Sequence, residues 1–252
     1  IGQIASALMV FRYLLRYKAG RFEKKHLMPQ WTYAGYSMSL GLAQCFNQVA
    51  MMVVQIVMNN SLTYYGARSV YGESVPLASA GIINKVSFMY SPRSEERFIA
   101  QGMQPIVSFN YGARKYDRVK KAVKLSLCSG AIICVTAFLL FQAFPRQIIG
   151  LFGKGTEMYF VFAERYFRIY LFFTFINNIQ PLSSNFFSSI GKPSKGTFLS
   201  LTRQIIFLLP LLIIFPRFLG IDGIMFAGPI ADFMAAAISA VLLIREMRNM
   251  GK

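Results

Sequence analysis

The sequence predicts an all-α, polytopic membrane protein built as a bundle of spanning helices. Hydrophobic residues make up 55% of the chain and charged residues only 15%, whereas soluble domains carry about 25% charged residues. Residues 26–67 contain no formal charge, and this run is about twice as long as one spanning helix requires. Short basic segments separate the apolar runs. Together these observations favour a membrane protein over a soluble one.

The first 32 residues combine the end of a helix with a basic linker. Residues 1–11 are apolar, and we expect them to be the last turns of a helix whose beginning is truncated. Six basic residues follow between Arg12 and Lys25, which predicts a cytoplasmic loop. We therefore expect residues 1–32 to join two lobes and residues 33–252 to form a lobe of six spanning helices.

Six segments have the length and composition of membrane spans. We expect them at 33–58, 76–111, 125–144, 159–187, 197–215 and 223–244. Eighteen basic residues, Arg203 among them, fall in loops on one side of this topology, and four fall in loops on the other. Basic loops face the cytoplasm. The bias predicts a multi-pass protein of the cell (inner) membrane with a cytoplasmic carboxyl terminus.

Several other function classes lack support in the sequence. The net charge of +17 is explained by basic loops between spans, and no basic patch is interleaved with stacking aromatics, so we expect no nucleic-acid partner. The chain has one histidine, His26, and no paired cysteines, which argues against a zinc site. We see no catalytic constellation and no ATP site, and so predict neither an enzyme nor a bound cofactor.

Two prolines interrupt predicted spans. Gln104-Pro105 lies in the second span, within a motif that begins at Gly102. The span ends at Asn110-Tyr111-Gly112, and a basic run follows. Proline removes a helical hydrogen bond, and lipid tolerates the freed backbone only beside protein or water. The fourth span carries a similar step in Asn177, Asn178 and Gln180-Pro181. Two broken helices would indicate a transport pathway.

A stripe of amide side chains follows the first span. It consists of Gln44, Asn47, Gln48, Gln55 and Asn59, which fall within about 120° of arc on a helix. Such a stripe faces protein or water rather than lipid. Two interpretations remain open: hydrogen bonds between helices, or the wall of a solute cavity.

Two charges lie deep in predicted spans. Lys85 and Asp232 each follow the outer end of a span by nine residues, which places them about 13 Å deep. Intramembrane charges are usually paired or functional, so Lys85 and Asp232 are predicted to pair or to share a polar cavity; the alternative is a separate partner for each. The complete set of cavity-lining candidates is Gln44, Asn47, Gln48, Gln55, Asn59, Asn84, Lys85, Gln104, Asn177, Asn178, Gln180 and Asp232.

Three motifs in order resemble the carboxyl-terminal half of the multidrug and toxic compound extrusion (MATE) family. They are G-M-Q-P-I-V-S-F-N-Y-G-A at 102–113, F-S-S-I-G-K-P-S-K-G at 187–196 and G-I-D-G-I-M-F-A-G-P-I-A-D at 220–232. The resemblance covers almost the whole chain and implies a six-helix lobe, helices seven to twelve. It also implies a secondary transporter that exports amphipathic, often cationic drugs in exchange for Na⁺ or H⁺ by alternating access. Its partners would be the lipid bilayer, those drugs and an amino-terminal lobe.

The sequence departs from the family in two places. Some members carry an acid on helix seven, where this chain has only neutral groups such as Gln48, so Asp232 is the deep acid that this half offers for ion coupling. The family also has an apolar turn where residues 91–97 read S-P-R-S-E-E-R; buried charges are costly, and we interpret this patch as a sequence error rather than a gate or loop. Alternatives to the drug exporter are a lipid or glycan flippase of the same superfamily and a non-transporting truncated remnant.

Overall fold

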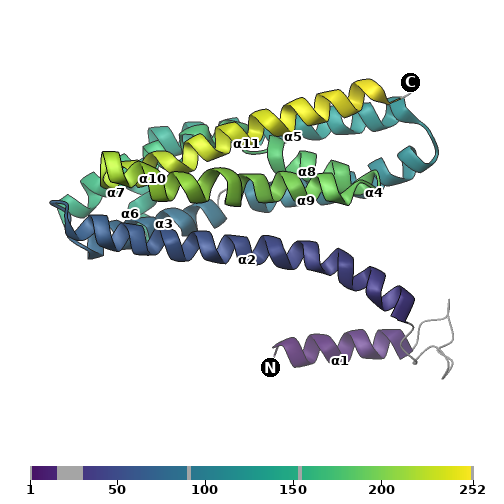
Figure 1. Cartoon of the computed structure of the whole chain (residues 1–252), viewed down its shortest axis with the longest axis horizontal. Helices are drawn as coiled ribbons and strands as arrows, with labels where there is room; N and C mark the ends of the chain where they lie inside the picture. Colours follow the sequence, from purple (N-terminus) through teal and green to yellow (C-terminus); the bar gives the residue numbers. More distant parts are fainter. Residues whose placement is uncertain (1, 16–30, 90–91, 153–154, 251–252) are drawn as a thin grey trace. The chain divides into compact units, whose positions relative to one another are not determined.

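A computed structural model describes residues 2–15, 31–89, 92–152 and 155–250, and every regular element in these ranges is a helix (Figure 1). The chain divides into two compact units, residues 1–43 and 44–252. The first unit holds α1 (Gly2–Leu15) and the beginning of α2 (Trp31–Ala67). Most of the predicted linker between Arg12 and Lys25 lies outside the described residues.

The second unit contains the rest of α2 and the remaining helices, as predicted for an all-α bundle. Their order along the chain is α3 (Ser74–Met89), α4 (Pro92–Gly112), α5 (Tyr116–Ala143), α6 (Pro145–Phe152), α7 (Glu157–Tyr170), the 3₁₀ segment η2 (Phe172–Ile176), α8 (Ile179–Ser189), α9 (Pro193–Leu201), the π-helical segment η3 (Thr202–Leu208), α10 (Leu209–Leu219) and α11 (Ile221–Asn249).

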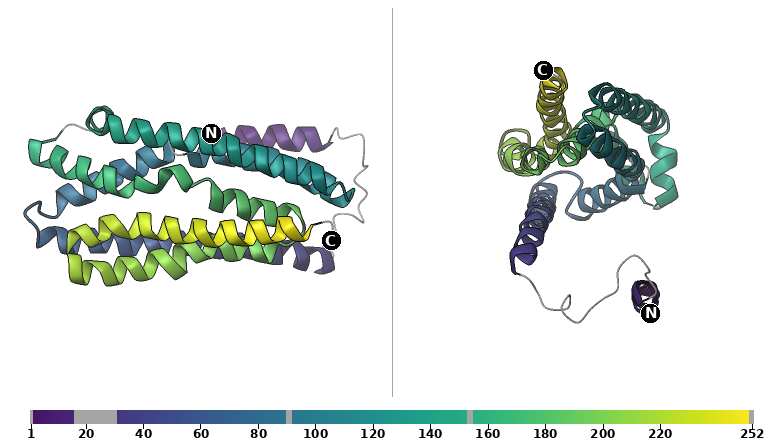
Figure 2. Two further views of the ribbon diagram at one scale, coloured as in Figure 1. Left: turned by 90° about the horizontal axis from the view of Figure 1, so that it is seen from above. Right: turned by 90° about the vertical axis from the view of Figure 1, so that its right-hand side faces the viewer.

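Each predicted span corresponds to helix, but two spans are interrupted, and a third, at 197–215, is one continuous helix made of α9, η3 and α10. The second consists of α3 and α4, and the fourth of α7, η2 and α8. By length and composition, three of the described helices are apolar enough to cross a membrane: Tyr116–Ala143, Pro193–Leu219 and Ile221–Asn249. The last two are neighbours, because η3 and α10 pack along α11 (Figures 1 and 2).

The predicted break at Gln104-Pro105 is wrong. The helix α4 runs from Pro92 to Gly112 with Pro105 inside it. Proline removes only its own bond to the carbonyl four residues earlier, and the turns on either side continue the helix. The division in this span falls instead between α3 and α4. The charged patch at 91–97 lies at that junction; its backbone is helical from Pro92, and its side chains lie outside the described part of the structure.

The interruption predicted in the fourth span is confirmed. After α7 the chain forms η2, in which Phe173 leaves the helical region of backbone conformation, and α8 begins at Ile179. Pro181 therefore sits in the first turn of α8. A proline is tolerated there because first-turn N–H groups have no partner within the helix.

Two apolar clusters fill the second unit. One gathers large side chains such as Leu62, Phe162 and Leu212 from α2, α7 and α10. The other is built around Phe186 and Phe187 of α8, with contributions from α4, α5, α9 and α11. The helices α5 and α11 and the segment 193–219 each contribute to both clusters, so these three cross the region between them.

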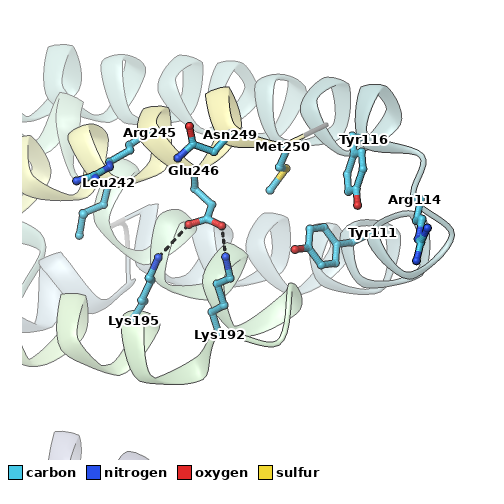
Figure 3. A pocket seen from close by; sticks show the side chains of 10 residues that line it. All are labelled: Tyr111, Arg114, Tyr116, Lys192, Lys195, Leu242, Arg245, Glu246, Asn249 and Met250. Carbon is cyan, nitrogen blue, oxygen red and sulfur yellow. Dashed lines mark hydrogen bonds and ion pairs between the residues drawn. The ribbon is translucent and has the colours of Figure 1, made fainter. Parts of the chain in front are cut away.

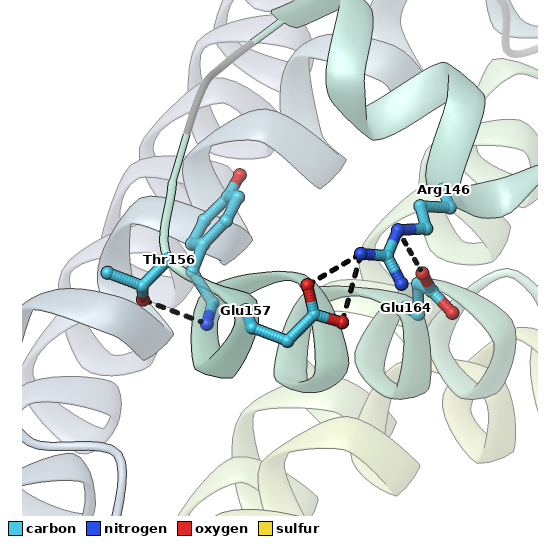
Figure 4. Close-up of polar contacts among 5 residues, drawn as sticks. Arg146, Thr156, Glu157 and Glu164 are labelled. Carbon is cyan, nitrogen blue, oxygen red and sulfur yellow. Dashed lines mark hydrogen bonds and ion pairs between the residues drawn. The ribbon is translucent and has the colours of Figure 1, made fainter.

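The short helix α6 is absent from the predicted spans, and it organises one end of the unit (Figure 4). It starts at Pro145, a residue suited to the first position of a helix. Arg146 then reaches α7, where its Nη2 lies 2.7 Å from Glu157 Oε2 and its Nε lies 3.6 Å from Glu164 Oε1. The hydrogen bond from Arg146 to Glu157 raises the pKa of the arginine. Thr156 caps α7 by accepting a hydrogen bond from the Tyr159 N–H.

Candidate functional site

The interruption before α8 places a buried amide between the two apolar clusters. Asn178 is buried, and its Nδ2 donates to the carbonyl oxygen of Leu127 on α5 at 3.0 Å. Gly130 makes this approach possible: a Cβ at that position would lie 2.9 Å from Asn178 Nδ2. A side-chain bond to a backbone carbonyl joins two helices and satisfies the amide in an apolar setting.

Gln180 extends this contact to another helix. Its Nε2 donates to the carbonyl oxygen of Leu199 on α9 at 3.1 Å, and its neighbour Asn177 is half-buried. Within α8, Asn185 Nδ2 donates a hydrogen bond to the carbonyl oxygen of Pro181. Asn178 and Gln180 therefore join neighbouring helices by hydrogen bonds, which is a structural role for amides within a span.

Two charged side chains with little exposure form an ion pair between η3 and α11. Asp232 on α11 accepts a hydrogen bond at its Oδ1 from Arg203 Nε, 2.5 Å away. The side chains of Arg203 and Asp232 are only 13% and 8% exposed. Along their helices, both residues fall between the two apolar clusters. The cost of burying each charge is offset by its partner.

This pair corrects two expectations. Asp232 pairs with Arg203 and not with Lys85, whose side chain on α3 is exposed. Arg203 is also not a loop residue: it lies within the continuous helical segment 193–219. The sequence carried a signal for this, because Arg203 is the one charge within the predicted fifth span. A lone basic residue inside an apolar run calls for a buried acid on a neighbouring helix.

The π-helical segment η3 supplies the local geometry around Arg203. It covers Thr202–Leu208 and ends just before Pro210, which belongs to the first turn of α10. A proline cannot bond to the carbonyl four residues earlier, and its ring crowds that carbonyl. A wider turn ahead of it relieves this conflict, and such π segments are frequent at functional sites. The widened turn is where the helix presents Arg203 to α11.

The amide stripe on α2 runs along one edge of the buried face of this helix. Ala50, Val54, Met58 and Leu62 are buried at four-residue intervals. Gln48, Gln55 and Asn59 are exposed, Asn47 is half-buried, and the side chain of Gln44 lies outside the described residues. Gln55 Nε2 donates to Asn59 Oδ1 at 2.9 Å. These two amides bond to each other and remain open to whatever covers this face of α2.

The remaining candidates take local roles. Asn84 is half-buried, and Gln104 is exposed on α4, as is Gly102. At the end of α4, Asn110 Nδ2 donates to the carbonyl oxygen of Ile106 at 2.8 Å. Tyr111 packs edge-on against Tyr116 at the start of α5. Asn110, Tyr111 and Gly112 thus shape the turn between α4 and α5.

The arrangement separates polar groups into two kinds. Asn178, Gln180 and Asp232 are each held by a partner outside the candidate set, whereas Gln55 and Asn59 hold each other on an exposed face. Among the described residues, no group of three His, Cys, Asp or Glu side chains is placed to hold a metal ion. What the candidates share is hydrogen-bonding capacity, suited to contacts with a polar or charged solute.

Comparisons with known proteins agree on one family. The MatE family model matches residues 43–214. The multidrug export protein MepA of Staphylococcus aureus is 21% identical over 210 residues, covering 83% of this chain and 44% of that protein, and MepA of Staphylococcus saprophyticus is 20% identical with the same coverage. The chain therefore spans about half the length of these relatives.

Solved structures show the same fold. A MOP superfamily transporter from Pyrococcus furiosus superimposes with a TM-score of 0.83 at 15% identity, over 99% of this chain and 55% of that one. The outward-facing conformation of a multidrug resistance MATE family transporter gives a TM-score of 0.82 at 15% identity, over 98% of this chain and 54% of the other.

Proposed function

Because the chain belongs to the MatE family of multidrug and toxic compound extrusion transporters, we propose that it supplies one six-helix lobe of a secondary active exporter. The exporter carries amphipathic, often cationic drugs out of the cell in exchange for Na⁺ or H⁺, by alternating access between two lobes. The MepA relatives, which are multidrug export proteins, support this proposal, as does the fold shared with MATE transporters. The protein resides in the cell membrane with its carboxyl terminus in the cytoplasm.

The observation that carries the proposal is the exposed amide stripe on α2. A bilayer does not solvate amides, so polar groups on a spanning helix face protein or a water-filled cavity. Gln48, Gln55 and Asn59 are exposed in this chain, beside the buried face of α2. The chain spans about half the length of its relatives. We therefore place the stripe at the cavity between this lobe and a second one.

Ion coupling rests mainly on the second lobe in this proposal. Asp232 is the one deep acid that we consider in this half, and Arg203 occupies its carboxylate. A coupling ion would have to displace the guanidinium, which a buried ion pair opposes. Residues 1–252 by themselves would offer no opposing surface to close a cavity, and we expect this segment alone not to export drugs.

An efflux assay tests the proposal. The complete reading frame that contains these residues is expressed in cells lacking their own drug exporters, and the initial rate of ethidium efflux is measured. The double variant Gln55→Leu/Asn59→Leu should lower that rate about tenfold at equal membrane abundance, because one lost hydrogen bond to the substrate costs about 1–1.5 kcal/mol.

The matched control changes two exposed apolar residues on a different face of the same helix, Val49→Ala/Val53→Ala. These variants should leave the efflux rate unchanged. Unchanged efflux in the amide variant would contradict the placement of the stripe, and resistance in cells that express only residues 1–252 would contradict the proposal of a dependent lobe.

A further inference from the structure

A pocket of about 930 Å³ opens where three parts of the second unit meet (Figure 3). They are the turn from α4 into α5, the turn from α8 into α9, and the last turns of α11. The pocket lies at the end of the bundle that the basic loops assign to the cytoplasm. It is separate from the ion pair of Arg203 and from the amide stripe of α2.

The charges around the pocket are unbalanced. Arg114, Lys192, Lys195 and Arg245 line it, together with one acid, Glu246. Glu246 accepts hydrogen bonds from both lysines; its Oε2 lies 3.0 Å from Lys195 Nζ, and its Oε1 contacts Lys192 Nζ. The bond to Glu246 raises the pKa of Lys192, so that lysine stays charged. Within the described part of the chain, no ion pair joins Arg114 or Arg245 to an acid.

The helix ends add to this positive charge. The helices α5 and α9 both begin here, and their N-cap residues are Lys115 and Lys192, neither of which makes a side-chain capping bond. Helix starts favour Asp, Asn, Ser or Thr and negative charge, because the N–H groups and the helix dipole are positive there. Basic residues at two adjacent starts oppose both preferences, and a bound anion would resolve the conflict.

Backbone strain occurs at the same place. Arg114 has φ of 56°, in the left-handed region that residues other than glycine seldom occupy. Hydrogen bonds fix the turn around it: the Arg114 N–H donates to the Tyr111 carbonyl and the Lys115 N–H to the Asn110 carbonyl. Strained residues held by their surroundings gather at binding sites. The turn therefore holds the Arg114 side chain at the end of the pocket.

The other lining groups suit a phosphate ester that carries an apolar tail. The hydroxyl of Tyr111 faces the space beside Lys192, the hydroxyl of Tyr116 points toward Tyr111, and Arg114 lies beyond them (Figure 3). Hydroxyls and guanidinium groups donate hydrogen bonds to phosphate oxygens. Leu242 and Met250 of the α11 end provide apolar surface on the same pocket.

We propose that this pocket binds the phosphate group of an anionic phospholipid, with Arg114 and Arg245 as cationic ligands and Glu246 as the residue that positions Lys192 and Lys195. Basic pockets between spanning helices on the cytoplasmic side are suited to anionic headgroups. The site is independent of the exporter proposed above, since a lipid bound here touches none of the residues placed on the transport pathway.

Native mass spectrometry of the purified chain in mild detergent tests this site. Dioleoylphosphatidylglycerol is titrated against dioleoylphosphatidylcholine, and inorganic phosphate is titrated in a separate arm. The unchanged chain should bind one phosphatidylglycerol in preference to phosphatidylcholine. The double variant Arg114→Gln/Arg245→Gln should bind it about tenfold more weakly, because charge-assisted hydrogen bonds are lost.

The control variant Lys124→Gln/Arg248→Gln removes the same charge from exposed positions on α5 and α11 that do not line the pocket. It should retain the lipid. Equal weakening in both double variants, or no preference for phosphatidylglycerol, would overturn the proposal. Phosphate that binds with the same dependence on Arg114 and Arg245, without any preference for the lipid, would identify a free phosphate as the ligand and overturn the assignment to a lipid. Circular dichroism of each variant checks that the helices are retained.

Discussion

Removal of one partner from the ion pair of Arg203 and Asp232 is the sharpest test of the bundle's energetics. In the variant Asp232→Asn the guanidinium loses the carboxylate that its Nε contacts at 2.5 Å. Both side chains are well under one third exposed, so water gives the pair little screening. Breaking a buried pair in this way costs about 3–5 kcal/mol, and insertion scales give about 2.5–3.5 kcal/mol for one charge at the centre of a membrane helix.

The two ranges overlap near 3 kcal/mol, which is a large part of the 5–15 kcal/mol that stabilises a typical domain. The double variant Arg203→Met/Asp232→Leu removes both charges and fills similar volume. Replacing a whole buried pair by apolar residues is often neutral or stabilising. The double variant should therefore recover most of the loss, and a double-mutant cycle should give a coupling free energy of about 3 kcal/mol.

The assay is equilibrium unfolding of the purified chain in detergent micelles, followed by helical circular dichroism. It is run for Asp232→Asn and for the four members of the cycle, which are the unchanged chain, Arg203→Met, Asp232→Leu and the double variant. A control in the same assay is Arg146→Gln, at an exposed pair on α6 and α7; exposed pairs contribute little, and its transition should stay close to that of the unchanged chain. If Asp232→Asn unfolds like the unchanged chain, or if the double variant is no more stable than the single ones, the pair does not hold α11 to its neighbour and the reasoning fails.

Two further predictions concern local packing and can be measured by the same unfolding assay. Gly130→Ala should destabilise the chain by about 1–3 kcal/mol, because the new Cβ would displace Asn178, which links α8 to α5. The control Gly81→Ala, where nothing lies within 4 Å of the new Cβ, should be neutral or stabilising by about 0.5–1 kcal/mol. An equal loss of stability in both variants would contradict the steric reasoning. Thr156→Ala removes the α7 cap and should cost about 1 kcal/mol, whereas Thr156→Ser, which keeps the hydroxyl, should retain the stability; a full loss in the serine variant would show that the cap is not the cause.

The fold could be predicted from the sequence because lipid imposes a simple rule on the backbone of a spanning segment. Long apolar runs must form helices whose backbone bonds are satisfied internally, so the predicted spans coincide with helix. The interruption before α8 was also predictable, since Asn178 and Pro181 bring two features that disfavour a continuous helix to one place. The helix α6 was missed because its eight residues, which begin at Pro145, are too few to be recognised as a span.

The errors arose where hydropathy gives no information on which way a helix faces. Pro105 was taken as a break, yet one missing hydrogen bond does not end a helix whose other turns are intact. Arg203 was assigned to a loop because of its charge, although it lies within an apolar run. Nothing in the sequence fixes the rotation that turns it toward Asp232 across 29 residues of chain; that rotation depends on the π-helical segment that precedes Pro210.

Burial, rather than residue type, separates the structural polar groups from those available for transport. Asp232 and Asn178 attracted attention because charges and amides are costly in a membrane. The structure buries both of them against partners in the same unit, so their cost is already offset and a solute would have to compete with those partners. Gln55 and Asn59 are equally costly in lipid, yet they stay exposed, and among the described residues their side-chain amides have a hydrogen bond only to each other. A membrane helix with an exposed amide face requires a polar environment opposite that face, and this is why the proposed cavity is placed at α2 and not at the deepest charge.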